Sequence, residues 1–220
     1  MSRRNSAARR QILPKDDIST LRIIGGDWRS RKLPFPTIDG LRPTPDRVRE
    51  TLFNWLQTST PGAACLDLFC GSGALGFEAL SRGAASVTFV DRAPEVVHQV
   101  RQNLNLLKAQ NADVICAAVL DWLEMKQADQ EARYDLVFLD PPFRQNLIKS
   151  AATLLETRNL LNSNALIYIE TESDWQADGL PENWVLYREK TAGQVSYRLY
   201  QRDEPQSTIS ESDLSFAPHQ

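Results

Sequence analysis

The chain is poor in the side chains that most often hold metals or act as catalytic bases. Its 220 residues include two histidines, His98 and His219, and three cysteines, Cys65, Cys70 and Cys116. The second histidine lies in a polar tail, which argues against a histidine-based metal site or catalytic triad. The cysteines are odd in number and lack the spacing of metal ligands, so we expect reduced thiols, as in a cytoplasmic protein.

Long apolar runs are also missing. None approaches the ~20 residues that a bilayer-spanning helix needs. The first ten residues are basic, but no apolar segment of about 7–15 residues follows them, so we expect no secretory signal. What is present is 42% hydrophobic residues in a chain of 220, which suffices for one good-sized core. We therefore expect one large domain, or one with a small appendage, in the cytoplasm.

Charge is distributed unevenly along the chain. The net charge is −3, yet residues 1–56 hold 12 Lys or Arg against 6 Asp or Glu, and the remainder holds 13 against 22. A basic front end on an acidic body suggests an arm that binds a polyanion. The alternative is a solvated terminus that contacts nothing.

The first part of the chain predicts an arm, a hairpin and a linker. Residues 1–20 are polar and basic with little periodicity, which is typical of a flexible arm. Residues 21–24 and 28–33 predict two strands around a turn at 25–27. Residues 34–43 predict a linker.

A helix is expected after the linker, with Thr44 as its N-cap and Pro45 at its first position. Its apolar face is predicted by helical spacing and consists of Val48, Leu52, Trp55 and Leu56. On the hairpin, cations surround Trp28, a combination that suits nucleic-acid contact, although Trp28 could equally pack in the core. The candidates for phosphate contacts, which could instead be surface ion pairs, are Arg22, Arg29, Arg31, Lys32, Arg42, Arg47 and Arg49.

From residue 64 onward, strand-like and helix-like segments alternate. The predicted strands are 64–69, 86–90, 113–117, 134–139 and 165–170. The predicted helices are 74–81, 94–108, 119–126 and 147–155, and a hairpin follows at 184–190 and 194–200. Five βα units and a hairpin imply an α/β fold with a mostly parallel, doubly wound sheet of seven strands. Such sheets bind ligands outside the carboxyl ends of their strands.

A glycine pattern follows the first of these strands. Asp67 precedes Gly71, Gly73 and Gly76, which have Gly-x-Gly-x-x-Gly spacing between a strand and a helix. This pattern alone could mark a dinucleotide, a nucleoside cofactor or tight packing. An acid before the loop would repel a pyrophosphate and suits an amine or a sulfonium, and Asp91 is placed to bind ribose hydroxyls. A ligand with amine, ribose and adenine but no phosphate is S-adenosylmethionine.

The fourth strand ends in the sequence Asp140-Pro141-Pro142-Phe143. Neither proline can donate a ladder hydrogen bond, and each fixes its own φ, so the strand stops in a stiff corner. A carboxylate and carbonyl groups beside an aromatic ring suit a planar base that carries an amino group. The alternative is a plain turn. Together with Asp67 and Asp91, this corner would place three carboxylates on one edge of the sheet.

These motifs resemble those of a known family. Residues 67–76 look like the cofactor loop of class I methyltransferases, and residues 140–143 look like their amino-methylating (Asp/Asn)-Pro-Pro-(Phe/Tyr) motif. Residues 22–29, 41–56 and 189–195 resemble the bacterial 16S rRNA guanine-N2 methyltransferases that modify a guanine in the small-subunit head. The resemblance covers about residues 21–202 and implies a Rossmann-like fold. It leaves the arm and a polar tail at 203–220 outside.

The resemblance implies roles for particular residues. Asp67 would contact the methionine end of S-adenosylmethionine, Asp91 would hold its ribose, and the segment after Ala118 would border the adenine, where relatives often carry Asn or Asp at the position of Ala118. The implied cofactor-binding residues are Asp67, Phe69, Gly71, Ser72, Gly73, Asp91, Arg92, Val119, Leu120 and Asp140. The implied catalytic residues are Asp140, Pro141, Pro142 and Phe143.

The implied substrate is 16S rRNA in a small-subunit particle, bound by residues 21–60, with residues 61–202 as the methyltransferase domain of a monomer. In this hypothesis Asp140 and the Pro141 carbonyl accept the two amino N–H bonds while Phe143 stacks on an unstacked base. We expect no metal and no second cofactor. The alternatives are an amino methyltransferase acting on DNA adenine or protein glutamine, a non-catalytic ribosome-assembly factor, and a nicotinamide dehydrogenase.

Overall fold

The computed structural model describes residues 18–38, 43–127, 133–142 and 146–203. Most of the expected arm and tail, together with Arg42 and Phe143, therefore lie outside the described residues. Residues 18–20 were expected in the arm but belong to a strand. Asp203 was expected in the tail, but its backbone N–H donates to the Asn183 carbonyl oxygen at 2.7 Å.

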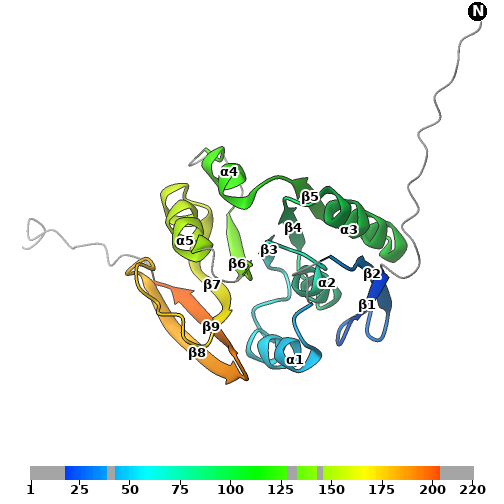
Figure 1. The fold of residues 1–220 in the computed structure, drawn as a ribbon, viewed down its shortest axis with the longest axis horizontal. Coiled ribbons are helices and arrows are strands. Elements are labelled where there is room, and N and C mark those ends of the chain that lie inside the picture. Colours follow the sequence, from blue (N-terminus) through cyan, green and yellow to red (C-terminus); the bar gives the residue numbers. More distant parts are fainter. Residues whose placement is uncertain (1–17, 39–42, 128–132, 143–145, 204–220) are drawn as a thin grey trace, which may run out of the picture.

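A seven-stranded sheet forms the centre of the molecule (Figure 1). Its strand order is β5-β4-β3-β6-β7-β9-β8. The first five strands in this order are parallel to one another, and β9 is antiparallel to both of its neighbours, β7 and β8. The strands are β3 (Ala64–Leu68), β4 (Ser86–Asp91), β5 (Ala112–Cys116), β6 (Tyr134–Leu139), β7 (Leu161–Glu172), β8 (Trp184–Ala192) and β9 (Val195–Arg202). This is the predicted α/β fold with its carboxyl-terminal hairpin.

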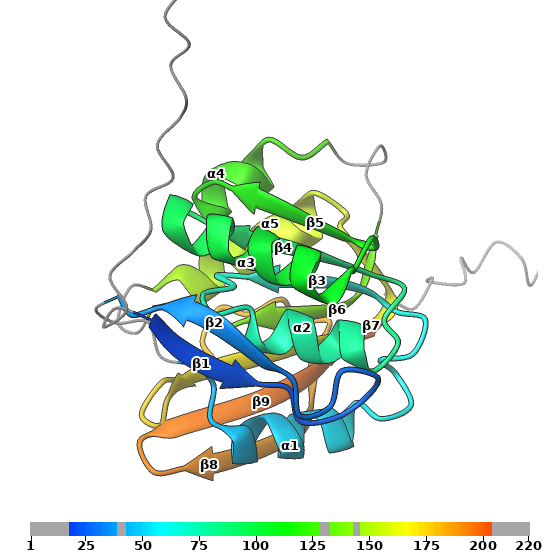
Figure 2. The same ribbon diagram turned by 90° about the vertical axis from the view of Figure 1, so that its right-hand side faces the viewer.

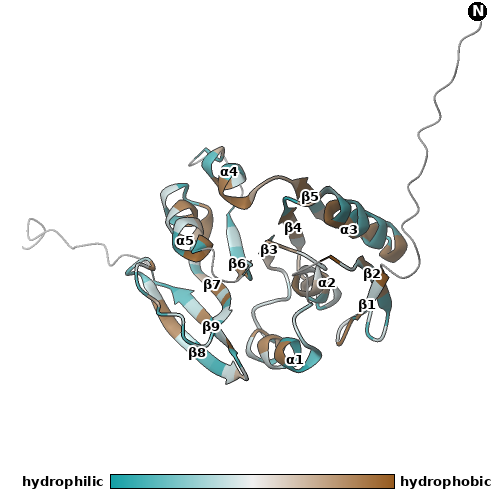
Figure 3. Cartoon of the chain, in the orientation of Figure 1, coloured by the Kyte–Doolittle hydropathy of each residue, from teal (hydrophilic) through white to brown (hydrophobic). Residues whose placement is uncertain are grey.

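Helices cover both faces of the sheet because buried strand residues alternate between two hydrophobic clusters. In β6, Leu136 and Phe138 belong to one cluster, whereas Val137 and Leu139 belong to the other. The first cluster includes residues of α1 (Asp46–Trp55), α2 (Ala74–Ser81) and α3 (Pro94–Leu107). The second includes residues of α4 (Val119–Glu124) and α5 (Leu147–Thr157). Figure 3 shows the corresponding division on α3, whose ribbon carries both hydrophobic and hydrophilic stretches.

A separate two-stranded sheet lies beside α2 and α3 (Figure 2). It pairs β1 (Ile18–Arg22) with β2 (Lys32–Pro36) in antiparallel register, Leu21 opposite Leu33. The prediction of a strand at 28–33 and a linker from 34 was therefore wrong in its boundaries. Phe35 is buried like Leu33, so burial extends the strand, and prolines are tolerated in a strand that has a neighbour on one side. Trp28 is half-buried against the core, as the packing alternative expected.

Helix α1 begins differently from the prediction. Pro45, rather than Thr44, stands at the N-cap, and no side chain caps the helix. The Pro45 carbonyl oxygen accepts the backbone N–H groups of Val48 and Arg49 at 2.9 and 3.0 Å. The buried Thr44 hydroxyl lies instead 3.5 Å from a carboxylate oxygen of Asp140. Thr44 therefore does not cap the helix as predicted; its side chain contacts the end of a distant strand instead.

In the described part of the chain, no helix has the length and apolar character needed to cross a membrane.

Candidate active site

The three predicted carboxylates lie at one edge of the sheet. Leu68 of β3 is level with Val90 of β4 and with Leu139 of β6, so the carboxyl ends of the parallel strands stand side by side. Asp67, Asp91 and Asp140 occupy these ends. We call this side of the sheet the carboxyl edge; the opposite side is the amino edge.

The glycine loop between β3 and α2 uses left-handed backbone conformations. Phe69 has φ +61°, and Gly73 has φ +75° at the N-cap of α2. A Cβ atom on Gly73 would lie 2.6 Å from the Phe77 ring, and one on Gly76 would lie 2.2 Å from the Phe89 ring. A side chain at Gly76 would therefore push α2 away from β4, whereas one at Gly73 would displace the Phe77 ring and be strained at a positive φ.

Asp91 ties the glycine loop to the next strand. One of its oxygens accepts the Gly71 backbone N–H at 2.9 Å, and the other accepts the Ala93 backbone N–H at 2.9 Å. Arg92, between them in sequence, is exposed. Asp91 was predicted as a ribose ligand; what the structure shows is that its carboxylate fixes the shape of the glycine loop.

Asp67 is almost fully enclosed. It is 2% exposed, and its Oδ2 accepts the Gly76 backbone N–H at 2.9 Å. Burial raises the pKa of Asp67 to about 8, with a smaller contribution from the charge of Asp91, while the bond from Gly76 opposes the shift. A cationic ligand at this position would favour the ionised form again.

The corner after β6 holds a second carboxylate. Asp140 is half-buried, the Pro141 that follows it is buried, and Pro142 is exposed. Desolvation by the surrounding protein raises the pKa of Asp140 well above its usual range, and the charges of Glu170 and Asp67 raise it further. The Thr44 hydroxyl at 3.5 Å opposes the shift weakly. We call Asp140, Pro141 and Pro142 the acceptor corner.

Glu170 is a residue that the sequence reasoning missed. Leu139 of β6 is in register with Ile169 of β7, so Asp140 and Glu170 follow each other across neighbouring strands. Glu170 is 6% exposed and accepts a hydrogen bond from the Tyr168 hydroxyl at 2.8 Å. Burial raises the pKa of Glu170. The available signal was that Glu170 ends a predicted strand, as the other site carboxylates do.

The adenine side of the expected cofactor site is assembled at the start of α4. Ala118 is the exposed N-cap of α4, and the Ala117 backbone N–H donates to the Asp91 carbonyl oxygen at 2.9 Å. Val119 is buried in the second hydrophobic cluster, whereas Leu120 packs at its margin. Any contact of Val119 with a ligand at the carboxyl edge would therefore be made by its backbone. Phe69 also borders this cluster, and Ser72 is 5% exposed.

The residues predicted to bind phosphate are dispersed over the molecule, and the prediction for Arg49 is wrong. Arg49 is 1% exposed; it pairs with Asp46 at 2.6 Å and with Glu78 at 3.5 Å. It also donates to the carbonyl oxygens of Thr44 and Arg22 at 3.2 and 2.9 Å. These contacts fix the guanidinium inside the protein, so Arg49 stabilises the fold and is not available to a phosphate. Its neighbour Arg47 is exposed.

The cations of the hairpin loop lie away from the acceptor corner, whereas Arg22 lies beside the start of α1. Arg31 donates to the Leu106 carbonyl oxygen at 3.2 Å, near the carboxyl end of α3. Because α3 begins at the carboxyl edge after β4 and runs back, its last turn lies toward the amino edge. Arg29 and Lys32 are exposed in or beside the same loop. Arg22 is half-exposed and pairs with Asp46 at 2.9 Å.

The residues at the carboxyl edge fit S-adenosylmethionine by their chemistry. Carboxylates suit the amine, the sulfonium and the ribose hydroxyls, while the loop from Asp67 to Gly76 contains no cation to pair with a pyrophosphate. Within the described residues, no group of three or more His, Cys, Asp or Glu side chains could hold a metal ion. The described cysteines are free, and two of the three are buried.

The fold and this edge define the class of protein: a Rossmann-like methyltransferase that uses S-adenosylmethionine. Residues 21–201 match the family model described as "Conserved hypothetical protein 95". The chain is 51% identical over 183 residues to ribosomal RNA small subunit methyltransferase D of Escherichia coli (strain K12), covering 83% of this chain and 90% of that protein. It is 54% identical over 183 residues to the Haemophilus influenzae protein of the same name, with 82% and 93% covered.

Solved structures agree with this relationship. The Escherichia coli protein yhhF superposes with a TM-score of 0.77 at 50% identity, covering 85% of this chain and all of that one. A Haemophilus influenzae structure superposes with a TM-score of 0.73 at 50% identity, covering 84% and 100%. The chain belongs to the family of ribosomal RNA small subunit methyltransferase D.

Proposed function

We propose that this protein transfers the methyl group of S-adenosylmethionine to the exocyclic N2 of one guanine in the 16S rRNA of the small ribosomal subunit. The names of its relatives support rRNA as the substrate. The observation that carries the choice of an amino acceptor is the acceptor corner, where Asp140 and the buried Pro141 stand at the carboxyl edge beside the cofactor residues.

The acceptor chemistry explains why a carboxylate followed by prolines is useful. The lone pair of guanine N2 is delocalised into the ring, so the nitrogen is a poor nucleophile. In our proposal Asp140 accepts one amino N–H and the Pro141 carbonyl oxygen accepts the other, which favours a pyramidal nitrogen whose lone pair is aimed at the methyl group. The prolines keep the two acceptors in fixed relative positions.

The methyl donor site is proposed on the same edge. S-adenosylmethionine supplies the methyl group from a sulfonium, so a strong base is not required. Asp67 would bind the methionine end, Asp91 the ribose, and the backbone of the glycine loop would approach the cofactor closely. The proton left on the product nitrogen would pass to Asp140 or to solvent.

The base must leave its RNA surroundings to reach the corner. We propose that Phe143, which lies outside the described residues, stacks on it. Residues 21–60 would contact RNA and residues 61–202 would form the methyltransferase domain. Of the described cations, the exposed Arg47 is closest in sequence to Thr44, which contacts Asp140, so we place it nearest the acceptor strand. The substrate would be a particle in the cytoplasm, and the enzyme a monomer.

The test is methyl transfer from labelled S-adenosylmethionine to small subunits that lack their own modification, followed by digestion and identification of the nucleoside. We expect N2-methylguanosine at a single site. Label in N6-methyladenosine would move the proposal to another amino acceptor. Absence of transfer by a protein that still binds S-adenosylmethionine would favour a non-catalytic assembly factor.

A further inference from the structure

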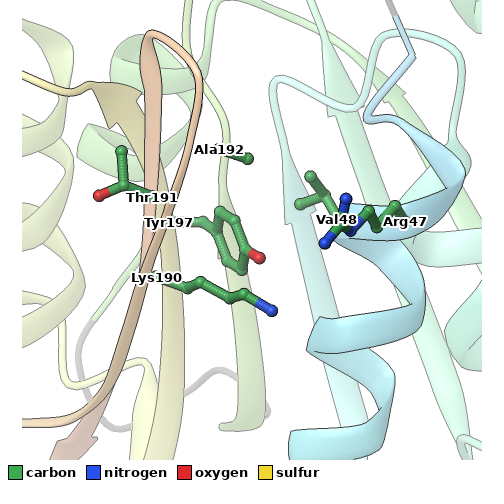
Figure 4. Close-up of a pocket in the computed structure, with 6 residues that line it drawn as sticks. All are labelled: Arg47, Val48, Lys190, Thr191, Ala192 and Tyr197. Carbon is green, nitrogen blue, oxygen red and sulfur yellow. The ribbon is translucent and has the colours of Figure 1, made fainter.

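A small cavity lies between α1 and the β8–β9 hairpin (Figure 4). Its volume is about 140 Å³, and its lining residues are Arg47, Val48, Lys190, Thr191, Ala192 and Tyr197. Figure 4 shows the ends of Arg47 and Lys190 reaching toward the gap from opposite sides, with the Tyr197 hydroxyl between the two elements. The cavity therefore has two cationic walls and a hydroxyl group.

The two cations are not used elsewhere in the described part of the chain. Arg47 and Lys190 are both exposed. Among the described residues, neither side chain forms an ion pair or a hydrogen bond, in contrast to Arg49, Arg82, Arg198 and Arg202, each of which is paired with a glutamate. Two facing cations repel each other, so this arrangement is most favourable when an anion lies between them.

The cavity stands in line with the acceptor corner. Glu170 of β7 is in register with Tyr197 of β9, and Tyr197 is in register with Lys190 of β8. Because Glu170 neighbours Asp140, a row runs across four strands from Asp140 to Lys190, with side chains on the same face of the sheet. Neighbouring strands are ~4.8 Å apart, so Lys190 begins roughly 14 Å from Asp140.

This row is acidic at one end and basic at the other. Asp140 and Glu170 present carboxylates, which suit the N–H groups of a base, whereas Arg47 and Lys190 suit a phosphodiester. Tyr197 is 1% exposed and packs on Trp55 with ring centroids 5.6 Å apart, so its position is fixed by the core. The start of α1 lies along this row: Thr44, just before the helix, contacts Asp140, and Arg47 follows three residues later.

We propose that Arg47, Lys190 and the Tyr197 hydroxyl form a phosphate clamp, which binds a backbone phosphodiester of the acceptor RNA strand next to the nucleotide whose base enters the acceptor corner. The clamp rests on the proposed function, because it assigns a subsite to the same substrate. It sets the distance between the held backbone and the reacting base, so it would contribute to the choice of the modified nucleotide.

The test uses Lys190→Gln, Arg47→Gln and the double variant. Binding of an RNA fragment that contains the acceptor strand is measured at several salt concentrations, and methylation of small subunits is measured alongside. Each single variant should weaken RNA binding roughly tenfold at ~0.1 M salt and lower the salt-dependence slope by about 1. It should raise KM with little change in kcat. The double variant should lose less than the product of the single losses, because both cations bind one phosphate.

Lys108→Gln is the matched control, since Lys108 is an exposed lysine that follows α3 on the amino edge. It should leave affinity and slope unchanged, and all variants should keep the wild-type melting temperature and affinity for S-adenosylmethionine. Unchanged RNA affinity and slope in Lys190→Gln would overturn the clamp. So would fully multiplicative losses in the double variant, because they would indicate two independent sites.

The outcome for the clamp is separable from that of the proposed function. RNA affinity and its salt slope report on the clamp, whereas the methylated nucleoside reports on the reaction. Weakened RNA binding by the variants, in a protein that methylates a different nucleoside, would support the clamp and overturn the assignment of guanine N2. A loss of activity without loss of RNA affinity would mean that the cavity receives another part of the particle, such as an acidic protein segment, and would overturn the clamp.

Discussion

Two carboxylates in different regions of this molecule, the buried Glu78 and the half-buried Asp140, differ in the number of hydrogen-bond partners that they have. Near the amino-terminal hairpin, Glu78 is 0% exposed and is saturated with donors: the backbone N–H groups of Ile24 and Gly25 at 2.9 and 2.8 Å, Arg82 at 2.8 Å and Arg49 at 3.5 Å. At the carboxyl edge, the described contact of the Asp140 side chain is one hydroxyl at 3.5 Å.

The number of partners distinguishes a carboxylate with a structural role from one that is open to a ligand. A buried carboxylate that is fully paired joins parts of the chain, and here Glu78 and Arg49 attach the hairpin and α1 to α2. A buried carboxylate with few partners costs folding free energy, because desolvation is not offset. Such a cost is retained where a ligand provides the missing partners. The next four predictions test this contrast, from the largest expected effect to the smallest.

Asp140→Ala should lower kcat by roughly 10²–10³-fold or more, because one of the two acceptors for the amino group is lost. Its folding stability and its affinity for S-adenosylmethionine should be retained. Single-turnover methylation and calorimetric cofactor binding measure these effects. Asp140→Asn keeps an acceptor oxygen and should lose less activity. A fully active Asp140→Ala enzyme would refute the proposed role.

Arg49→Ala should reduce the free energy of unfolding by about 3–5 kcal/mol, since it leaves Glu78 and Asp46 with fewer partners in a buried network. Urea denaturation measures the change. The exposed neighbour Arg47 is the matched control, and Arg47→Ala should change stability by no more than about 0.5 kcal/mol. Equal effects of the two substitutions would contradict the structural role of Arg49.

The stability of the cofactor-free protein should fall as pH rises from about 4 to about 8 because of Asp67. Its pKa is raised to about 8 in the folded protein, whereas the unfolded chain loses the proton near pH 4. The unfolded state therefore binds fewer protons in this window, and rising pH favours unfolding. Above pH 8 this contribution is constant. Asp67→Asn removes the titration and should reduce the difference between urea midpoints at pH 5 and pH 8; an unchanged difference would contradict it.

Glu170→Gln should shift the pH dependence of methylation toward lower pH. Asp140 accepts a hydrogen bond best when ionised, so activity should rise with pH as it loses its proton. The charge of Glu170 raises the pKa of Asp140, and removing that charge makes the proton easier to lose. Single-turnover rates across pH measure the shift. An unmoved profile would mean that another group controls the reaction.

The sequence was sufficient for the fold because alternating apolar segments specify it locally. The strand predicted at 134–139 and the helix predicted at 74–81 have the same bounds in the structure. The amino-terminal hairpin was harder: Pro34 and Pro36 argued for a linker, whereas the burial of Phe35 in a long-range core extends β2. That burial depends on packing against α3, which the local sequence does not reveal.

The candidate site shows the same limit. The strand-end rule placed Asp67, Asp91 and Asp140 on one edge, as the structure confirms. Glu170 also ends a predicted strand, but its place beside Asp140 comes from the register between β6 and β7, which the sequence does not give. Nor could it distinguish Arg49 from Arg47, because one of the partners that enclose Arg49 is Glu78, 29 positions away. Composition identifies the cations, but only the fold determines which of them is available to a ligand.

The contact between Thr44 and Asp140 links the position of α1 to the acceptor corner. Thr44 is joined to α1 by a single proline, so displacement of α1 would be transmitted to the hydrogen bonding of Asp140. The glycine loop, by contrast, is anchored to β4 through Asp91 and Cys70, in hydrogen bonds that do not involve α1. The position of one short helix therefore bears directly on the hydrogen bonding of Asp140, whereas the contacts that hold the glycine loop to β4 are made within the sheet and the loop itself.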